Sequence, residues 1–324
     1  MLLLALLLAT ADRFYVSNEG SGDVSVIEGS IEIARIPVGT RPRGLKLRGQ
    51  TLYVAVSGSP RGGPGVDEKD LPPGDHTKDG IAVVDLAQRR VVARLPGGSD
   101  PESFDLDRDG KLLFVSNEDA SALSVVEIAS AKVLHTTAVG AQPEGVTVSP
   151  EGTSVYVTSE EDSEIDVVSL PRFALVARIK VDARPRGIVF TRDGKRAFVS
   201  CEQGAAVDVI DAARKVRSGR IAISGQGVKP MGLALSADGR TLFASTGRGG
   251  SVAVIDTASL RVERVIPAVG ARPWGIAVSN DGTRLYTANG NSDDVSIVDL
   301  QAGRVTAKVR AGNLPWGIAV SPQR

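Results

Sequence analysis

The chain has 324 residues, 38 Lys+Arg against 38 Asp+Glu, and a single cysteine. The zero net charge argues against a nucleic-acid or anionic-membrane partner, since both favour a basic excess, and one cysteine excludes an intramolecular disulfide. Aromatic residues make up only 4% of the chain while glycines number 36, a profile typical of many short strands joined by tight turns.

The chain begins with an apolar run, MLLLALLLATA, over residues 1–11. An apolar stretch followed by Ala9-Thr10-Ala11 resembles the hydrophobic region and cleavage site of a secretory signal, although no Lys or Arg precedes it. The run is too short to span a bilayer as a helix. We expect residues 1–11 to be a signal peptide, so that the mature protein begins at Asp12 and is periplasmic or secreted. A buried N-terminal segment is the alternative.

An internal repeat decides the fold, because a proline followed by one residue and usually a glycine recurs along the chain. The prolines of this Pro-x-Gly motif are Pro42, Pro101, Pro143, Pro185, Pro230, Pro273 and Pro315. Their spacings of 59, 42, 42, 45, 43 and 42 residues define a repeat of roughly 42 residues, with one insertion in the first.

Each repeat follows one plan of four short strands. In the sixth repeat the expected strands are 275–278, 284–288, 294–299 and 304–309. Asp281-Gly282 is a hairpin turn signal between the first two, because glycine accepts positive φ. Alternating apolar residues and β-branched side chains favour strands over helices. Four antiparallel strands per unit of this length are the signature of a propeller blade.

The two ends of the chain predict a closed ring. Residues 13–17 read as the second strand of a blade, and residues 317–320 read as a first strand. Joined, they make one blade, with three strands from residues 13–38 and one from the C-terminus. An open stack of repeats would not explain why the strand missing at one end is supplied at the other. We therefore predict an all-β fold over residues 12–324: a single seven-bladed β-propeller, closed without free sheet edges.

The insertion in the first repeat spans residues 57–79 and is dominated by Gly, Pro and Asp. This composition indicates a loop rather than an added domain. Long loops in compact domains are often functional or disordered. The insertion is therefore either a docking loop over the channel mouth or a solvated loop.

Three segments carry a family resemblance: FYVSNEGSGDVSVIEG, LYTANGNSDDVSIVDL and RPWGIAVSNDGTRLY. Over residues 13–324 the chain resembles the YVTN-repeat β-propellers of bacteria and archaea. More narrowly, it is similar to the β-propeller proteins associated with PQQ-dependent alcohol catabolism. The resemblance implies an exported protein that works near quinoprotein dehydrogenases without holding the quinone itself, and it offers no agreed catalytic residues. We expect no bound cofactor.

The first strand of each propeller blade lines the central channel, so the loop before it and the loop after the second strand open on one face. The loops before the first strands supply cations, anions and both tryptophans of the chain: Arg41, Arg43, Glu102, Glu144, Arg184, Arg186, Lys229, Arg272, Trp274 and Trp316. The loops after the second strands supply carboxylates at one repeat position: Glu19, Glu118, Glu160 and Glu202. In the other three blades we expect glycines 58, 247 and 290 at this position.

These residues form the candidate ligand-binding site at the channel mouth. Arginines hold carboxylates or phosphates through paired hydrogen bonds, and tryptophans stack on planar ligands or cations. The alternative is structural, with arginines paired to glutamates and tryptophans filling the ring. The four carboxylates could hold a hard cation, but neutralisation by arginine is the favoured interpretation, so we predict no metal site. Cys201 occupies a small-residue turn position.

Catalytic constellations are largely absent, because the two histidines, His76 and His135, and one cysteine give no zinc or nucleophile pattern. We expect a monomeric periplasmic scaffold that binds a protein or small anionic ligand, accessory to quinoprotein alcohol oxidation, with no membrane span. The alternative is a lactonase-like hydrolase that uses channel-mouth carboxylates, with arginines stabilising an oxyanion. A carboxylate with a perturbed pKa beside Arg184 or Arg186 would favour the hydrolase.

Overall fold

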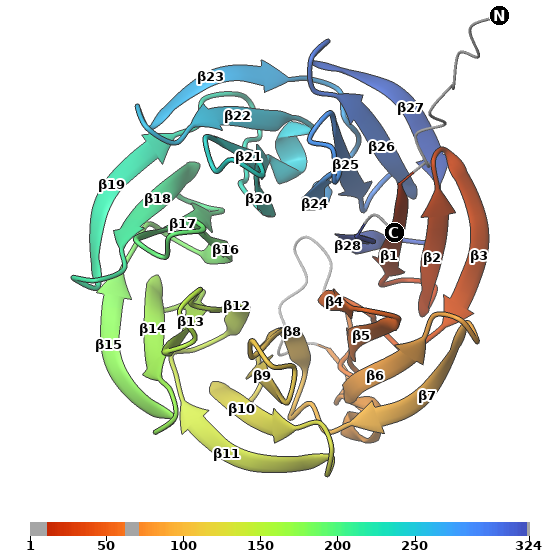
Figure 1. The fold of residues 1–324 in the computed structure, drawn as a ribbon, viewed down its shortest axis with the longest axis vertical. Helices are drawn as coiled ribbons and strands as arrows, with labels where there is room; N and C mark the ends of the chain where they lie inside the picture. Colours follow the sequence, from red (N-terminus) through yellow and green to blue (C-terminus); the bar gives the residue numbers. More distant parts are fainter. Residues whose placement is uncertain (1–11, 62–70, 323–324) are drawn as a thin grey trace, which may run out of the picture.

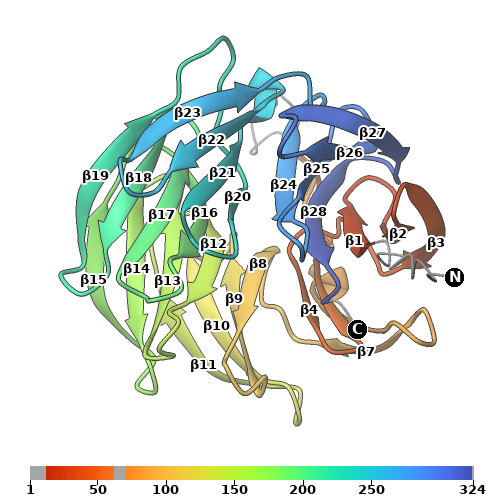
Figure 2. The same ribbon diagram turned by 45° about the horizontal axis from the view of Figure 1, so that its top comes forward.

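The computed structural model describes residues 12–61 and 71–322. Their strands form seven antiparallel four-stranded sheets arranged around a central axis, with one strand of each sheet near the axis and one at the rim (Figure 1). The tilted view in Figure 2 shows the inner strands β4, β8, β24 and β28 running along this axis. The predicted seven-bladed propeller is confirmed. Among the described residues no helix is long and apolar enough to cross a membrane.

Blades are numbered in chain order, with the composite blade last. Blade one comprises β4 (Leu45–Arg48), β5 (Thr51–Val56), β6 (Gly80–Asp85) and β7 (Arg90–Leu95). Blade two comprises β8 (Pro101–Leu106), β9 (Leu112–Asn117), β10 (Ala122–Glu127) and β11 (Lys132–Ala138). Blade three comprises β12 (Pro143–Val148), β13 (Ser154–Ser159), β14 (Glu164–Ser169) and β15 (Ala174–Lys180). Blades four and five comprise β16 (Pro185–Phe190), β17 (Arg196–Cys201), β18 (Ala206–Asp211) and β19 (Val216–Ala222); and β20 (Leu233–Leu235), β21 (Thr241–Ser245), β22 (Val252–Asp256) and β23 (Arg261–Ile266). Blade six comprises β24 (Pro273–Val278), β25 (Arg284–Asn289), β26 (Asp294–Asp299) and β27 (Arg304–Arg310). Blade seven comprises β28 (Pro315–Val320), β1 (Arg13–Asn18), β2 (Asp23–Glu28) and β3 (Ile31–Pro37). Two short 3₁₀ turns, His76–Lys78 and Gly247–Gly249, lie in loops.

Blade seven closes the ring as predicted. Strand β28 pairs with β1, with Tyr15 opposite Ala319 and Val16 opposite Ile318, and Figure 1 shows these two strands side by side. The buried carboxylate of Asp12 accepts a hydrogen bond from the hydroxyl of Tyr286 in blade six at 2.7 Å. The chain end is therefore tied both to its own blade and to the preceding one.

The core is divided among the contacts between neighbouring blades. Seven apolar clusters each combine residues of two adjacent blades, and together they follow the ring all the way round. At the contact between blades six and seven, the rings of Phe14 and Tyr286 stack with their centroids 4.4 Å apart. Burial of apolar area is the main stabilising contribution to folding. A blade therefore gains this stabilisation by packing against neighbours on both sides.

The Pro-x-Gly motif forms a β-bulge at the start of the inner strand. In blades two, three, four, six and seven the register to the second strand shifts between the proline and the residue three positions later. A bulge redirects the side chain that it carries. The glycine has a separate cause: a Cβ on Gly275 would lie 2.5 Å from the carbonyl oxygen of Trp316, and one on Gly317 would lie 2.8 Å from that of Arg43. Only glycine allows inner strands to approach this closely.

A hydroxyl on the second strand anchors the next blade's bulge. Ser17 Oγ donates to the carbonyl of Arg43 at 2.6 Å, and Ser245 Oγ donates to that of Trp274 at 2.7 Å. The same contact is made by Ser116 to Glu144, Thr158 to Arg186 and Ser200 to Met231. The middle residue of Pro-x-Gly is thus held through its backbone, which leaves its side chain available to the channel.

Candidate functional site

The middle residues of the seven motifs form a ring of side chains at the channel mouth, here called the inner ring. In blade order it consists of Arg43, Glu102, Glu144, Arg186, Met231, Trp274 and Trp316. The four charged members occupy consecutive blades, and the three apolar members occupy the rest. Because blade seven adjoins blade one, the inner ring divides into one charged arc and one apolar arc.

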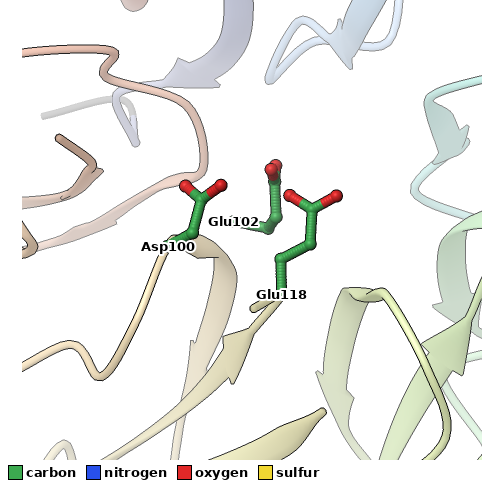
Figure 3. Close-up of side chains that lie close together, drawn as sticks. All are labelled: Asp100, Glu102 and Glu118. Atoms are coloured by element: carbon green, nitrogen blue, oxygen red, sulfur yellow. The ribbon is translucent and has the colours of Figure 1, made fainter. Parts of the chain in front are cut away.

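Arg43 is the centre of the first half of the charged arc. Its guanidinium pairs with Glu102 and lies 3.4 Å from Glu118, 3.5 Å from Glu19 and 3.6 Å from Asp100. Oxygens of Asp100, Glu102 and Glu118 lie within 4.8 Å of one another, and the three carboxyl groups point to the same side (Figure 3). The Arg43 guanidinium is the counter-charge of this cluster. Although burial lowers the pKa of Arg43, the surrounding carboxylates raise it by more, so Arg43 stays charged.

Arg186 plays the same part in the second half of the arc. Its guanidinium pairs with Glu144 and Glu160 and lies 2.8 Å from Glu202. Arg184 adds a second cation, 2.6 Å from Glu160. These five residues come from blades three and four. Side chains of the inner ring therefore meet side chains of the loops after the second strands here.

Burial and crowding perturb three of these carboxyl groups. Burial raises the pKa of Glu160 well above its usual value against the opposing effect of Arg186, and Glu144 adds to the rise. Burial acts on Glu144 too, but Arg186 and a hydrogen bond from Glu160 outweigh it and lower the pKa of Glu144. Of the two, Glu160 is therefore the carboxyl group that takes up a proton more readily. Burial also raises the pKa of Glu118 to about 7, against the charge of Arg43.

The apolar arc holds both tryptophans of the chain. The rings of Trp274 and Trp316 stack with centroids 5.3 Å apart and planes inclined by 26°. Two guanidinium groups lie over Trp274, that of Arg186 at 5.3 Å and that of Arg272 at 5.0 Å. Met231 is buried beside them. The cation–π contact of Arg186 with Trp274 links the charged arc to the apolar arc.

A cavity of about 200 Å³ lies inside the ring. Its polar wall includes Glu144 and Arg186, and its apolar wall includes Met231 and both tryptophans. Below them the cavity is lined by the glycines and aliphatic side chains of the inner strands. A concave apolar site with a few convergent polar groups is the usual form of a small-molecule site.

The residue before each motif proline has an unusual backbone. In six blades this residue is not glycine yet has a positive φ between 44° and 59°: Arg41, Asp100, Gln142, Arg184, Arg272 and Leu314. Non-glycine residues rarely adopt this conformation, and it concentrates at functional sites. The sequence analysis did not predict it, and only the recurrence of the pre-proline position could have drawn attention to it.

The loops after the second strands sit in a shared register. The N–H groups of Glu118, Glu160, Glu202 and Gly290 each donate to the carbonyl of the residue before the proline of their own blade. In blade one the equivalent residue is Ser57 rather than Gly58, because β5 ends at Val56. Cys201 ends β17 fully buried, and burial strongly raises the pKa of its thiol.

The base of the insertion is attached to the same face. The carboxylate of Asp79 accepts hydrogen bonds from the N–H groups of Gly58 at 2.7 Å and Asp100 at 3.0 Å. Arg41 donates to the carbonyl of Ser59 at 2.8 Å and lies 3.3 Å from Glu19. Residues 62–70 and the expected signal peptide fall outside the described residues, so both the role of the insertion and the export of the chain stay predictions.

Comparison with known proteins identifies the family. A model of YNCE-like beta-propellers matches residues 67–152 and 147–322, well over half of the chain. The chain belongs to the YNCE-like β-propeller family. No curated protein matches it. The similarity of this YNCE-like propeller to PQQ-associated propellers stays a prediction.

Solved structures show how widely this fold is shared. A functionally unknown protein from Desulfotomaculum acetoxidans superimposes with a TM-score of 0.79 at 15% identity, over 97% of this chain and 100% of that one. A protein from Lactobacillus plantarum gives 0.78 at 16% identity over 97% and 100%. The periplasmic gluconolactonase of Pseudomonas aeruginosa gives 0.76 at 20% identity over 97% and 99%. At these identities the likeness of the YNCE-like propeller to each shows the fold alone.

Proposed function

We propose that this propeller is an exported binding protein that holds a small anionic ligand at its channel mouth. The observation that carries the proposal is the division of the inner ring into a charged and an aromatic arc around one cavity. A ligand in this cavity would meet guanidinium groups on one side and indole rings on the other. Such a site orients a molecule that has one anionic end and one apolar end.

The location and the partner of the protein form part of the proposal. The apolar run at residues 1–11 supports export to the periplasm. The resemblance to PQQ-associated propellers supports a place beside a quinoprotein that oxidises alcohols. Alcohol oxidation yields organic acids, and these are ligands of the chemistry that the channel mouth would recognise.

Thermal unfolding of the chain from Asp12 onward tests this function. We would measure the unfolding midpoint with organic acids, lactones, PQQ, calcium and lanthanides. A ligand that binds only the native state raises the midpoint as its concentration exceeds its dissociation constant. We expect a saturable rise with organic acids that is lost in Trp274→Ala, while Tyr53→Phe, on strand β5 and outside the residues that line the cavity, retains it. A rise that survives in Trp274→Ala, or no rise with any compound, would contradict the proposal.

Hydrolysis of a lactone is a second candidate, favoured by one observation. Glu160 is a buried carboxyl group with a raised pKa beside Arg184 and Arg186, which is the feature expected of the hydrolase. A carboxylate with a pKa nearer to neutrality is a stronger general base for activating water, and an adjacent guanidinium would stabilise the oxyanion. The name of the Pseudomonas aeruginosa neighbour gives the substrate class to try first.

The rate of gluconolactone ring opening, followed with a pH indicator, separates the two candidates. A hydrolase would exceed the spontaneous rate, and Glu160→Gln would return the rate to that baseline. Glu161→Gln, which alters an exposed carboxylate next in the chain, is the matched control. A wild-type rate equal to the spontaneous rate would exclude gluconolactone hydrolysis and leave binding as the function.

A further inference from the structure

Among the described residues, the channel mouth has a sector in which two cations form no ion pair with a carboxylate. Arginines 41, 43, 184 and 186 each lie within 4 Å of at least one carboxylate. Arg272 in blade six and Lys229 in blade five occupy the same pre-proline position as Arg41 and Arg184. Neither forms an ion pair with any residue in the ranges 12–61 and 71–322. Anionic neutralisation therefore covers only part of the ring.

The missing partners follow from two glycines. Blades two, three, four and seven have a glutamate in the loop after the second strand. Blades five and six have Gly247 and Gly290 at the same repeat position. The N–H of Gly290 donates to the carbonyl of Arg272 at 3.0 Å, just as that of Glu202 donates to Arg184 at 2.8 Å. The two loops therefore share one backbone arrangement. In blade four this arrangement brings the Glu202 carboxylate to 3.4 Å from the guanidinium of Arg184.

Arg272 is also partly buried. It has a left-handed backbone with φ of 56° and lies over the indole of Trp274, which Arg186 also covers. Burial lowers the pKa of Arg272; the charge of Glu19 opposes this, the like charge of Arg186 adds to it, and Glu202 opposes it. A partly desolvated guanidinium beside a second one gains much from a counter-ion.

We propose that Arg272 anchors a small organic monocarboxylate in the place that glutamate fills in four other blades. The ligand's carboxylate would pair with the Arg272 guanidinium, and its carbon skeleton would extend over Trp274, Trp316 and Met231 of the apolar arc. The planar guanidinium matches the two oxygens of a carboxylate. A second carboxylate on the ligand would meet the acidic charged arc, so one negative charge is favoured. This inference rests on the proposed anion-binding function and specifies its site and ligand class.

The fluorescence of the chain reports on this site, because its only two tryptophans are Trp274 and Trp316. We would titrate butyrate and cyclohexanecarboxylate, with inorganic phosphate as the comparison anion. We expect a saturable change with both carboxylates. Arg272→Gln should weaken their binding by at least about tenfold, the loss expected for one charge-assisted pair. Arg304→Gln, which removes an exposed arginine of β27 in the same blade, should leave the affinity unchanged.

A second pair of variants tests the position directly. Gly290→Glu would place an internal carboxylate beside Arg272, and Gly290→Gln would add a side chain of the same size without the charge. A Cβ at residue 290 has its nearest neighbours at 3.4–3.6 Å, so the first atom of either side chain has ordinary contacts. We expect Gly290→Glu to abolish carboxylate binding and Gly290→Gln to retain it, with circular dichroism verifying that each is folded.

Three results would overturn the inference. Unchanged affinity in Arg272→Gln would move the anion to another part of the mouth, while the proposed function would stand. Tighter binding of phosphate than of either carboxylate would reject the ligand class. No fluorescence response of the wild-type protein to any anion would reject the inference. The proposed function would then be tested separately by the unfolding midpoints measured with the wider set of ligands.

Discussion

The guanidinium of Arg186 lies 5.3 Å from the ring centroid of Trp274, while the same group pairs with two buried glutamates of blade three, Glu144 and Glu160. One side chain thus connects the charged arc to the apolar arc. Because the pairs with Glu144 and Glu160 are withdrawn from water, the arginine is the charge that makes their burial tolerable.

Replacing Arg186 with Met should therefore destabilise the fold. Removal of one partner from a buried ion pair leaves an uncompensated charge and costs about 3–5 kcal/mol. We expect this loss in urea unfolding at pH 8. At pH 5 the loss should be smaller, because Glu160, whose pKa is already raised by burial, takes up its proton readily. Arg304→Met on the rim should change stability by less than about 0.5 kcal/mol.

Glu118 predicts a pH dependence of stability near neutrality. Burial raises its pKa from 4.5 to about 7 in the folded state. Its contribution is therefore fully present below the unfolded pKa near 4.5 and is lost as pH rises through about 7. Each unit of pKa difference corresponds to about 1.4 kcal/mol, so the rise from 4.5 to about 7 is worth on the order of 3–4 kcal/mol.

Comparison with Glu118→Gln isolates this contribution. The free energy of unfolding of the wild type, minus that of the variant, should fall between pH 5 and pH 8. A difference that stays constant over this range would show that Glu118 has an ordinary pKa in the folded protein. Asp119→Asn, which changes the exposed carboxylate next in the chain, is the control for nonspecific charge effects.

The close approach of inner strands predicts intolerance to a single methyl group. In Gly275→Ala the added Cβ would lie 2.5 Å from the carbonyl oxygen of Trp316. Relief requires a backbone shift, and overpacking of this kind costs about 1–3 kcal/mol. Gly290→Ala adds the same atom with ordinary contacts and should be nearly neutral. Equal unfolding midpoints for the two variants would show that the inner strands are free to separate.

The tie between blades six and seven gives a further prediction. Asp12→Ala would leave the hydroxyl of Tyr286 without the acceptor it has at 2.7 Å. A buried polar group without a partner costs about 1–3 kcal/mol, so urea unfolding should shift to lower concentration. Tyr286→Phe in the same background should recover part of the loss, because it removes the unpaired hydroxyl. Failure of this second change to recover stability would place the effect of Asp12 elsewhere.

The fold follows from the sequence because each blade repeats the same local signals. The Asp281-Gly282 turn and the alternating strands around it recur at a fixed period, so the strands 284–288 and 294–299 were predicted within a residue of β25 and β26. Ring closure was predictable too, since residues 13–17 and 317–320 each lack what the other supplies. The periodic pattern also located the inner ring, whose members share one position in the motif.

The sequence pattern did not predict which arginine of the site pairs with which carboxylate. Arg43 contacts Glu19, Asp100 and Glu118, which come from blades seven and two, and no local signal tells which of several nearby carboxylates an arginine selects. The opposite pKa shifts of Glu144 and Glu160 depend on burial and on the position of Arg186 in the neighbouring blade. The left-handed backbone before each proline was missed for another reason: non-glycine side chains normally avoid it.

In the five blades that have it, the bulge that carries the inner-ring side chain separates recognition from architecture. Proline, glycine and the hydroxyl of the neighbouring blade hold the backbone, and none of them depends on what stands between proline and glycine. Arginine, glutamate, methionine and tryptophan all occur there on one scaffold. The chain thus offers evolution, or a protein engineer, positions around one opening, above all those of the apolar arc, at which new specificities can be selected without rebuilding the propeller.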